Sequence, residues 1–197
     1  MTRTKEAREA TIAGIVILLL LSILFGLSFL ISILFSLPYS IGVPIWLKIA
    51  GGAMVACGLF VAGWLFRYRS PADMIVSTYV TFSKLLGRIQ ISESAQRTEP
   101  LIFSGPQKYV RHPLYFSLIL MVFGWGLVTE TTYVLIASAV LLVWFRFVLI
   151  PFEEKELRAL FGVQYERYMK STPMLAPFTK LKSPDKNSWG NKTSEKK

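Results

Sequence analysis

The sequence is poor in metal-binding residues and in charge. It holds one cysteine and one histidine among 197 residues, and charged residues make up only 17% of the chain. A single cysteine can form no internal disulfide. One cysteine and one histidine are also too few for a protein-bound zinc or haem centre. We therefore expect neither a disulfide framework nor a metal site.

Hydrophobic residues make up 53% of the sequence, a proportion that soluble domains seldom combine with so little charge. This composition indicates an integral membrane protein and leaves little room for a second, soluble domain. We expect one membrane-embedded domain over residues 1–178, followed by a basic flexible tail over 179–197. Within the domain, residues 1–99 would supply spans and an interfacial helix, and residues 100–178 the cofactor-binding and catalytic region.

The net charge of +10 is distributed unevenly along the chain. Lysines and arginines cluster before residue 11, between 67 and 111, and in the tail, whereas the connections 38–43 and 129–131 contain none. This is the positive-inside pattern, which places the basic ends in the cytoplasm. It also argues against nucleic-acid binding, which would need one continuous cationic face.

Four uncharged or nearly uncharged apolar runs are long enough to enter a membrane as helices, at 11–37, 44–66, 114–128 and 132–150. Only three residues separate the last two runs, so they should form an antiparallel hairpin that brings residues near 111 close to residues near 153. The second run carries Gly52, Ala56 and Gly63 at helical spacing, with Gly58 and Ala62 nearby, and small residues let helices approach closely in lipid. We expect it to pack centrally.

The segment 70–99 mixes apolar and polar residues and starts with Ser70-Pro71, a helix-start signal. It favours an amphipathic helix on the inner membrane surface, with a fifth span as the alternative. The predicted fold class is therefore an all-α integral membrane protein. It has four to five transmembrane helices and a cytoplasmic-side catalytic unit after a C-terminal helical hairpin.

A helix is predicted over residues 151–161, directly after the hairpin. At 100° per residue, Glu153 shares the apolar face with Leu157, and Glu154 lies on the flank within reach of Arg158. An ionised carboxylate on an apolar face is unfavourable without a partner. Glu153 is therefore the stronger candidate for a functional role.

Polar, aromatic and cationic groups thus collect at the inner face, and their pattern resembles a known family. The pattern is Ser-Gly-Pro-x-x-Tyr-Val-Arg-His-Pro-x-Tyr over residues 104–115, Glu-Glu at 153–154, and Phe-Gly-x-x-Tyr at 161–165. Over about residues 100–178 the chain resembles the integral-membrane methyltransferases that include isoprenylcysteine carboxyl methyltransferase and the phospholipid N-methyltransferases.

The resemblance implies S-adenosylmethionine as the methyl donor, bound between the Arg-His-Pro loop and the Glu-Glu helix. The implied cofactor-binding residues are Gln107, Tyr109, Val110, His112, Pro113, Tyr115, Glu153, Glu154 and Leu157. Arg111 falls on a position associated with the acceptor carboxylate, which makes Arg111 and Glu153 the candidate catalytic residues. The implied acceptor is the C-terminal α-carboxylate of a cysteine that carries a farnesyl or geranylgeranyl group.

The residue types suit this chemistry. A carboxylate acceptor is ionised at neutral pH and needs no general base, and an arginine fork can orient it with two hydrogen bonds. The alternatives are methylation of a phospholipid or another lipophilic substrate, reduction by an NADPH-dependent membrane enzyme of the sterol-reductase type, and a helical membrane subunit without enzymatic activity. In each case the lipid bilayer is an expected partner.

Overall fold

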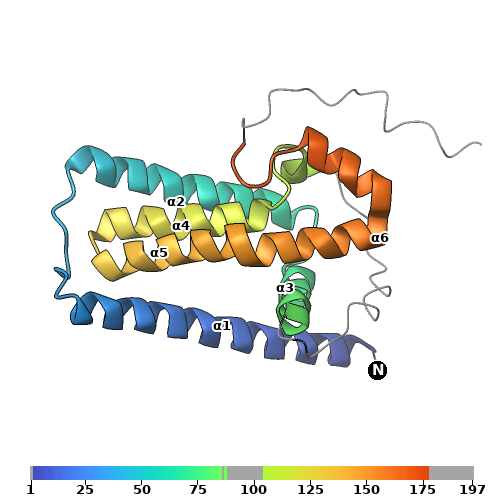
Figure 1. Cartoon of the computed structure of the whole chain (residues 1–197), viewed down its shortest axis with the longest axis horizontal. Helices are drawn as coiled ribbons and strands as arrows, with labels where there is room; N and C mark the ends of the chain where they lie inside the picture. Colours follow the sequence, from blue (N-terminus) through green and yellow to red (C-terminus); the bar gives the residue numbers. More distant parts are fainter. Residues whose placement is uncertain (1, 86, 88–103, 178–197) are drawn as a thin grey trace, which may run out of the picture.

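The computed structural model describes residues 2–85, 87 and 104–177 (Figure 1). The expected basic tail 179–197 and most of the polar link before residue 104 lie outside the described residues. In chain order the elements are α1 (Thr2–Leu34), α2 (Ile45–Phe66), α3 (Pro71–Leu85), the 3-10 helix η2 (Gly105–Lys108), α4 (Pro113–Thr129), α5 (Thr132–Trp144), the π-helix η3 (Phe145–Leu149) and α6 (Ile150–Ser171).

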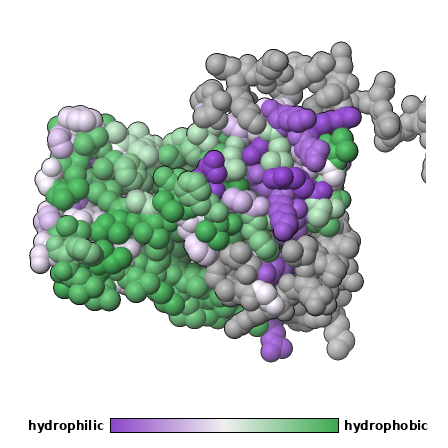
Figure 2. All heavy atoms as spheres, viewed as in Figure 1, coloured by the Kyte–Doolittle hydropathy of each residue, from purple (hydrophilic) through white to green (hydrophobic). Residues whose placement is uncertain are grey.

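The all-α membrane class predicted from composition is confirmed. In the described part, three helical stretches are long and apolar enough to cross a membrane: Thr11–Leu34, Ile45–Phe66 and the run Thr132–Ser171, which is kinked at Gly162 (φ 50°). The shorter apolar helix Pro113–Thr129 lies beside them. Figure 2 shows apolar side chains along most of the bundle and hydrophilic ones gathered at the end that carries η2 and α6.

Helices α2 and α4 pack at very close range through glycine. A Cβ added at Gly51 would lie 2.7 Å from the carbonyl oxygen of Gly124, and one added at Gly58 would lie 2.8 Å from the carbonyl oxygen of Ser117. Both distances are shorter than any real contact, so the two backbones can meet only where no side chain intervenes. The central packing predicted for the second span is confirmed.

The face predicted for that packing is wrong. Gly52 and Gly63 have nothing within 4 Å of an added Cβ, and Ala56 is exposed. The residues that pack are Gly51, Gly58 and their neighbour Ala62. Because α2 is apolar all round, its periodicity cannot show which small residues face a partner helix and which face lipid.

The hairpin of α4 and α5 is confirmed, and a charged contact closes its outer end. Glu130 adopts a left-handed backbone (φ 58°) that ends α4. Its carboxylate accepts a hydrogen bond from the backbone N–H of Val43 (3.1 Å) and lies 2.7 Å from the ammonium of Lys48. The α4–α5 turn is thereby tied to the start of α2.

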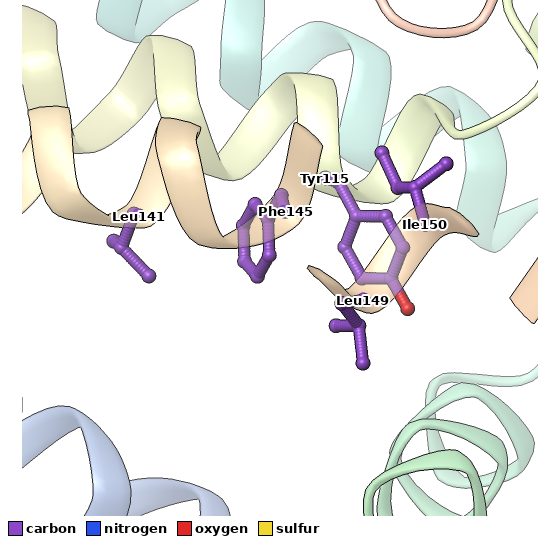
Figure 3. Close-up of a cluster of buried hydrophobic side chains, with 5 residues drawn as sticks. All are labelled: Tyr115, Leu141, Phe145, Leu149 and Ile150. Atoms are coloured by element: carbon purple, nitrogen blue, oxygen red, sulfur yellow. The ribbon is translucent and has the colours of Figure 1, made fainter. Parts of the chain in front are cut away.

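Helices α5, η3 and α6 follow one another without a loop, so the second hairpin arm runs directly into the helix that carries Glu153 and Glu154. A buried apolar cluster sits at this junction: Tyr115, Leu141, Phe145, Leu149 and Ile150. Figure 3 shows the ring of Tyr115 against Phe145, with centroids 4.7 Å apart, and its hydroxyl directed away from that ring. The cluster fixes the start of α4 against the start of α6.

Helix α3 crosses the direction of the long helices between α1 and the α5–α6 run (Figure 1). It spans 15 residues and packs its backbone mainly on α1 near the inner end of the bundle. A helix of about 22 Å lying across the bundle cannot also traverse the bilayer. Helix α3 is also not among the described stretches that are long and apolar enough to cross a membrane, and its position at the membrane surface stays a prediction.

The glycine contacts make a matched pair of substitutions informative. We expect Gly51→Ala to lower the free energy of unfolding by about 1–3 kcal/mol, because its methyl group would meet the backbone of α4. Gly52→Ala, one residue away and facing open space, should be neutral or stabilise by up to about 1 kcal/mol through helix propensity. Unfolding of the detergent-solubilised variants, followed by circular dichroism, measures both. Equal stability of the two variants would contradict the close approach of α2 and α4.

Candidate active site

The loop from η2 to the start of α4 is held on two sides. On one side, Gly105 has a positive φ of 64°, and an added Cβ there would lie 2.6 Å from the ring of Tyr68 at the end of α2. On the other side, the backbone N–H groups of Arg111 and His112 donate to the carbonyl oxygens of Pro173 (2.9 Å) and Met174 (3.2 Å). The segment that follows α6 therefore folds back along the loop.

Four side chains form a buried charge cluster where the loop meets α6. Glu154 is only 2% exposed, and its Oε1 lies 2.7 Å from Arg111 Nη2 and 3.3 Å from His112 Nε2. Glu153 Oε2 lies 3.5 Å from His112 Nδ1 and accepts a hydrogen bond from the hydroxyl of Tyr115 (3.1 Å). Buried carboxylates require such partners, because an unpaired charge away from water is very costly.

These contacts decide the charge of His112. Burial alone would lower the pKa of this imidazole, but hydrogen bonds and charge attraction from Glu153 and Glu154 outweigh burial and hold the pKa above its ordinary value. The two glutamates therefore favour the protonated form of His112, and the cluster pairs Arg111 and His112 with two carboxylates.

The prediction that Glu153 lies inward and Glu154 on the flank is wrong in its second half. Glu154 is the more buried carboxylate and pairs with Arg111 and His112, while Arg158, its predicted partner, is exposed. Glu153 keeps 17% of its side chain exposed. Helical periodicity marks the apolar face of a helix as the buried one, whereas Glu154 lies on a face of α6 that is buried against charged groups of the loop.

A cavity opens beside the cluster, and part of the predicted site lines it. The lining includes six of the predicted residues: Gln107, Arg111, His112, Pro113, Tyr115 and Glu153. It also includes six residues that the sequence did not indicate for the site: Leu65 of α2, Arg69 shortly after α2, Met74, Ser77 and Thr78 of α3, and Leu114 of α4. The amphipathic pattern of α3 placed it near the inner surface, but only the tertiary fold brings it to the loop.

Four predicted cofactor residues lie outside this lining. Glu154 is buried against Arg111 and His112, Val110 is buried in the packing of the loop, and Leu157 is half-buried on α6. Tyr109 is 57% exposed, with its ring 5.9 Å from that of Trp64. Their roles stay predictions from the resemblance.

Arg111 is more fully engaged than its predicted role would require. Its Nη1 donates to the carbonyl oxygens of Met169 (2.7 Å) and Thr172 (3.1 Å), and its Nη2 pairs with Glu154. Both terminal nitrogens therefore bind the protein itself. This guanidinium connects the loop to both the body and the end of α6, and its part in binding an acceptor stays a prediction.

The cavity suits a cofactor that is positively charged and rich in hydrogen-bond donors. Gln107 Oε1 is buried and accepts no hydrogen bond from any residue that the structure describes, which leaves it available to a ligand donor. The Glu153 carboxylate on the same lining suits an ammonium, a sulfonium or a ribose hydroxyl. S-adenosylmethionine carries all of these groups. Among the described residues, none form a cluster of three His, Cys, Asp or Glu side chains that could hold a metal.

A helical membrane bundle with this loop and glutamate pair defines an integral-membrane methyltransferase, and comparison with known sequences agrees. The family model described as phospholipid methyltransferase matches residues 46–164, which is more than half of the chain. The chain belongs to this family, and the resemblance seen in residues 100–178 is confirmed. No solved structure matches the chain significantly.

Curated relatives carry a more specific name. A methanethiol S-methyltransferase of Crocosphaera subtropica is 34% identical over 149 residues, which cover 73% of this chain and 54% of that protein. Methanethiol S-methyltransferase 2 of Bradyrhizobium diazoefficiens is 28% identical over 163 residues, or 75% of this chain and 56% of that protein. The chain thus spans about half the length of the curated relatives it matches.

Because the chain has only one histidine, its titration can be observed without assignment. We expect the single imidazole signal of histidine-labelled protein in NMR to titrate above pH 6.5, and Glu153→Gln to lower that pKa. A raised pKa in the folded state stabilises the fold at low pH. This contribution should be complete below the unfolded-state value of about 6.5 and be lost as pH rises through the folded-state value. An imidazole that titrates below 6.5 in the wild type would contradict the charge cluster.

Proposed function

We propose that this chain transfers the methyl group of S-adenosylmethionine to the sulfur of a small lipophilic thiol, in a site that faces the cytoplasm. One structural observation favours a thiol: of the two clustered carboxylates, Glu153 lines the cavity and remains partly accessible, with Tyr115 hydrogen-bonded to it. A thiol must lose a proton when it becomes a thioether, and Glu153 is a proton acceptor at the reacting cavity. The names of the curated relatives support the same acceptor class.

The residues of the cavity and of the charge cluster have separate proposed roles in methyl transfer. S-adenosylmethionine, when bound, supplies a methyl group on a positively charged sulfur. Gln107 Oε1 and the Glu153 carboxylate would accept hydrogen bonds from donor groups of the cofactor, and Glu153 would receive the proton that the thiol sulfur loses on methylation. His112 and Arg111 hold the carboxylate pair in place. Closing the reactants into a cavity at the membrane surface also excludes water and aligns them.

The proposed orientation of the cavity toward the cytoplasm rests on the distribution of lysine and arginine residues between the two ends of the bundle. The cavity lies at the end of the bundle where η2 and α6 carry the hydrophilic side chains (Figure 2). Arg67, Arg69 and Lys108 belong to this end, whereas the α1–α2 and α4–α5 connections at the other end contain no lysine or arginine. The positive-inside rule therefore favours a cytoplasmic site.

The α-carboxylate of a prenylated cysteine is the second candidate acceptor. Arg69, a cation on the cavity lining, favours it, because a guanidinium can orient a carboxylate. The engagement of Arg111 by Glu154 and two carbonyl groups weakens it, because the residue predicted to bind that carboxylate already has partners. Phospholipid amines are a third acceptor class that the family name suggests.

A panel assay separates these acceptors. Purified protein in nanodiscs, with methyl-labelled S-adenosylmethionine, is offered methanethiol, longer alkanethiols, a farnesylcysteine analogue and phosphatidylethanolamine. We expect labelled thioether from the thiols at a higher kcat/KM than any product of the other acceptors. Methyl ester from farnesylcysteine as the main product would establish the second candidate instead, and transfer to none of the acceptors would refute the proposal.

Substitution of Glu153 tests its role as proton acceptor. We expect Glu153→Gln to lower kcat for a thiol by about 10²–10⁴-fold and to weaken the dependence of kcat on pH, because the amide cannot take the proton. Glu166→Gln is the matched control, since Glu166 is an exposed glutamate on the same helix, α6. Retention of wild-type kcat by Glu153→Gln would exclude general-base catalysis by this residue.

A further inference from the structure

We propose that the buried ion pair between Lys84 and Glu156 is a positioning device that holds α3 against the cavity, so that α3 serves as the acceptor-side wall and sets the affinity for the thiol. This inference rests on the proposed function. It assigns a role to two residues that the catalytic cluster does not use.

One face of α3 runs from the cavity to the ion pair. Met74, Ser77 and Thr78 line the cavity, and Thr81 and Lys84 continue the same face at spacings of three and four residues. Met74, Thr81 and Lys84 are all buried. The helix therefore presents a single inward face, with the cavity at its first turns and a cation at its last turn.

The partner of that cation stands on the helix that carries the catalytic cluster. Glu156 follows Glu153 by three residues, within one turn of α6. The side chains of Lys84 and Glu156 are both 2% exposed, and the Lys84 ammonium contacts Glu156 Oε1. The same turn of α6 thus places the Glu153 carboxylate at the cavity and the Glu156 carboxylate against α3.

The ion pair is a buried contact between side chains of α3 and α6. The backbone of α3 packs mainly on α1, and only residues 67–70 connect α3 to α2. Glu156 Oε2 is buried and has no hydrogen-bond partner in the described part of the chain, so Lys84 is the group that compensates this carboxylate. Removing two charges from water is costly, and a buried pair is better explained by the single arrangement it enforces than by stability.

The pair then determines the distance between two parts of the lining. Gln107, His112, Tyr115 and Glu153 belong to the loop, α4 and α6, whereas Met74, Ser77 and Thr78 move with α3. A thioether and two small hydroxyl side chains offer an acceptor little charge and modest polarity, which suits a small neutral thiol. Loss of the ion pair would free this wall while the charge cluster of Arg111, His112 and the two glutamates stays assembled.

Single charge reversals and their combination test the proposal. Lys84→Glu and Glu156→Lys are each compared with the double exchange Lys84→Glu/Glu156→Lys, in which the pair is reversed and the charges still match. The controls are Lys170→Glu and Glu166→Lys, which change exposed residues of α6. For each protein we measure the affinity for S-adenosylmethionine by titration. The affinity for methanethiol is measured by titrating it into protein that is saturated with the demethylated cofactor, which cannot transfer a methyl group. Steady-state assays then give kcat and KM for methanethiol.

We expect each single reversal to raise the dissociation constant and KM for methanethiol at least tenfold, with cofactor affinity changed less than threefold. The double exchange should recover most of the lost thiol affinity, and the controls should resemble the wild type. If a single reversal does not fold, recovery in the double exchange still supports the proposal, and failure of the double exchange overturns it. Unchanged thiol affinity in both single variants, or equal loss of cofactor and thiol affinity, also overturns it.

The two titrations separate this inference from the proposed function. A wild type that binds methanethiol but transfers no methyl group contradicts the proposed function, while the thiol affinities of the variants still decide the role of the ion pair. A wild type that binds no thiol overturns both.

Discussion

The buried contacts of Glu154 with Arg111 and His112 are the interaction on which the rest of the polar end of the bundle, with η2 and α6, depends. They connect residues about forty positions apart, and the hairpin of α4 and α5 is what makes that distance short. In a low-dielectric environment each of these charges would be costly alone, so the loop, the start of α4 and α6 are stable only together. Arg111 extends the connection to the end of α6 through two carbonyl groups.

The bundle supports this cluster by two different means. In the membrane, where apolar groups gain little by leaving lipid, α2 and α4 associate through glycines that let their backbones touch. At the surface, ion pairs and backbone hydrogen bonds take over, and Gly105 lets the loop lie against Tyr68. The candidate active site therefore lies at the boundary between the glycine-mediated helix packing and the part of the bundle held by ion pairs and hydrogen bonds.

Much of this architecture could be predicted from the sequence, because hydrophobic runs and short links leave few choices. The spans, the hairpin and the approach of His112 to the glutamate pair all follow from run lengths and a three-residue turn. Two details could not be predicted. The packing face of α2 has no polar side to mark it, and Glu154 is buried because its partners are charged, which a periodicity argument within α6 cannot detect. The contribution of α3 to the cavity lining could not be predicted either, because it depends on the packing of α3 beside the loop and α6, which the sequence pattern of α3 alone does not specify.

The π-helix η3 determines how much length variation the chain can tolerate. A π turn holds one residue more than an α turn, so the helix after it is rotated by roughly 100° relative to an uninterrupted α-helix. Because α5, η3 and α6 are continuous, losing a single residue between Phe145 and Leu149 would turn Glu153, Glu154 and Glu156 away from their partners together. In this turn the constraint is therefore the number of residues and not their type.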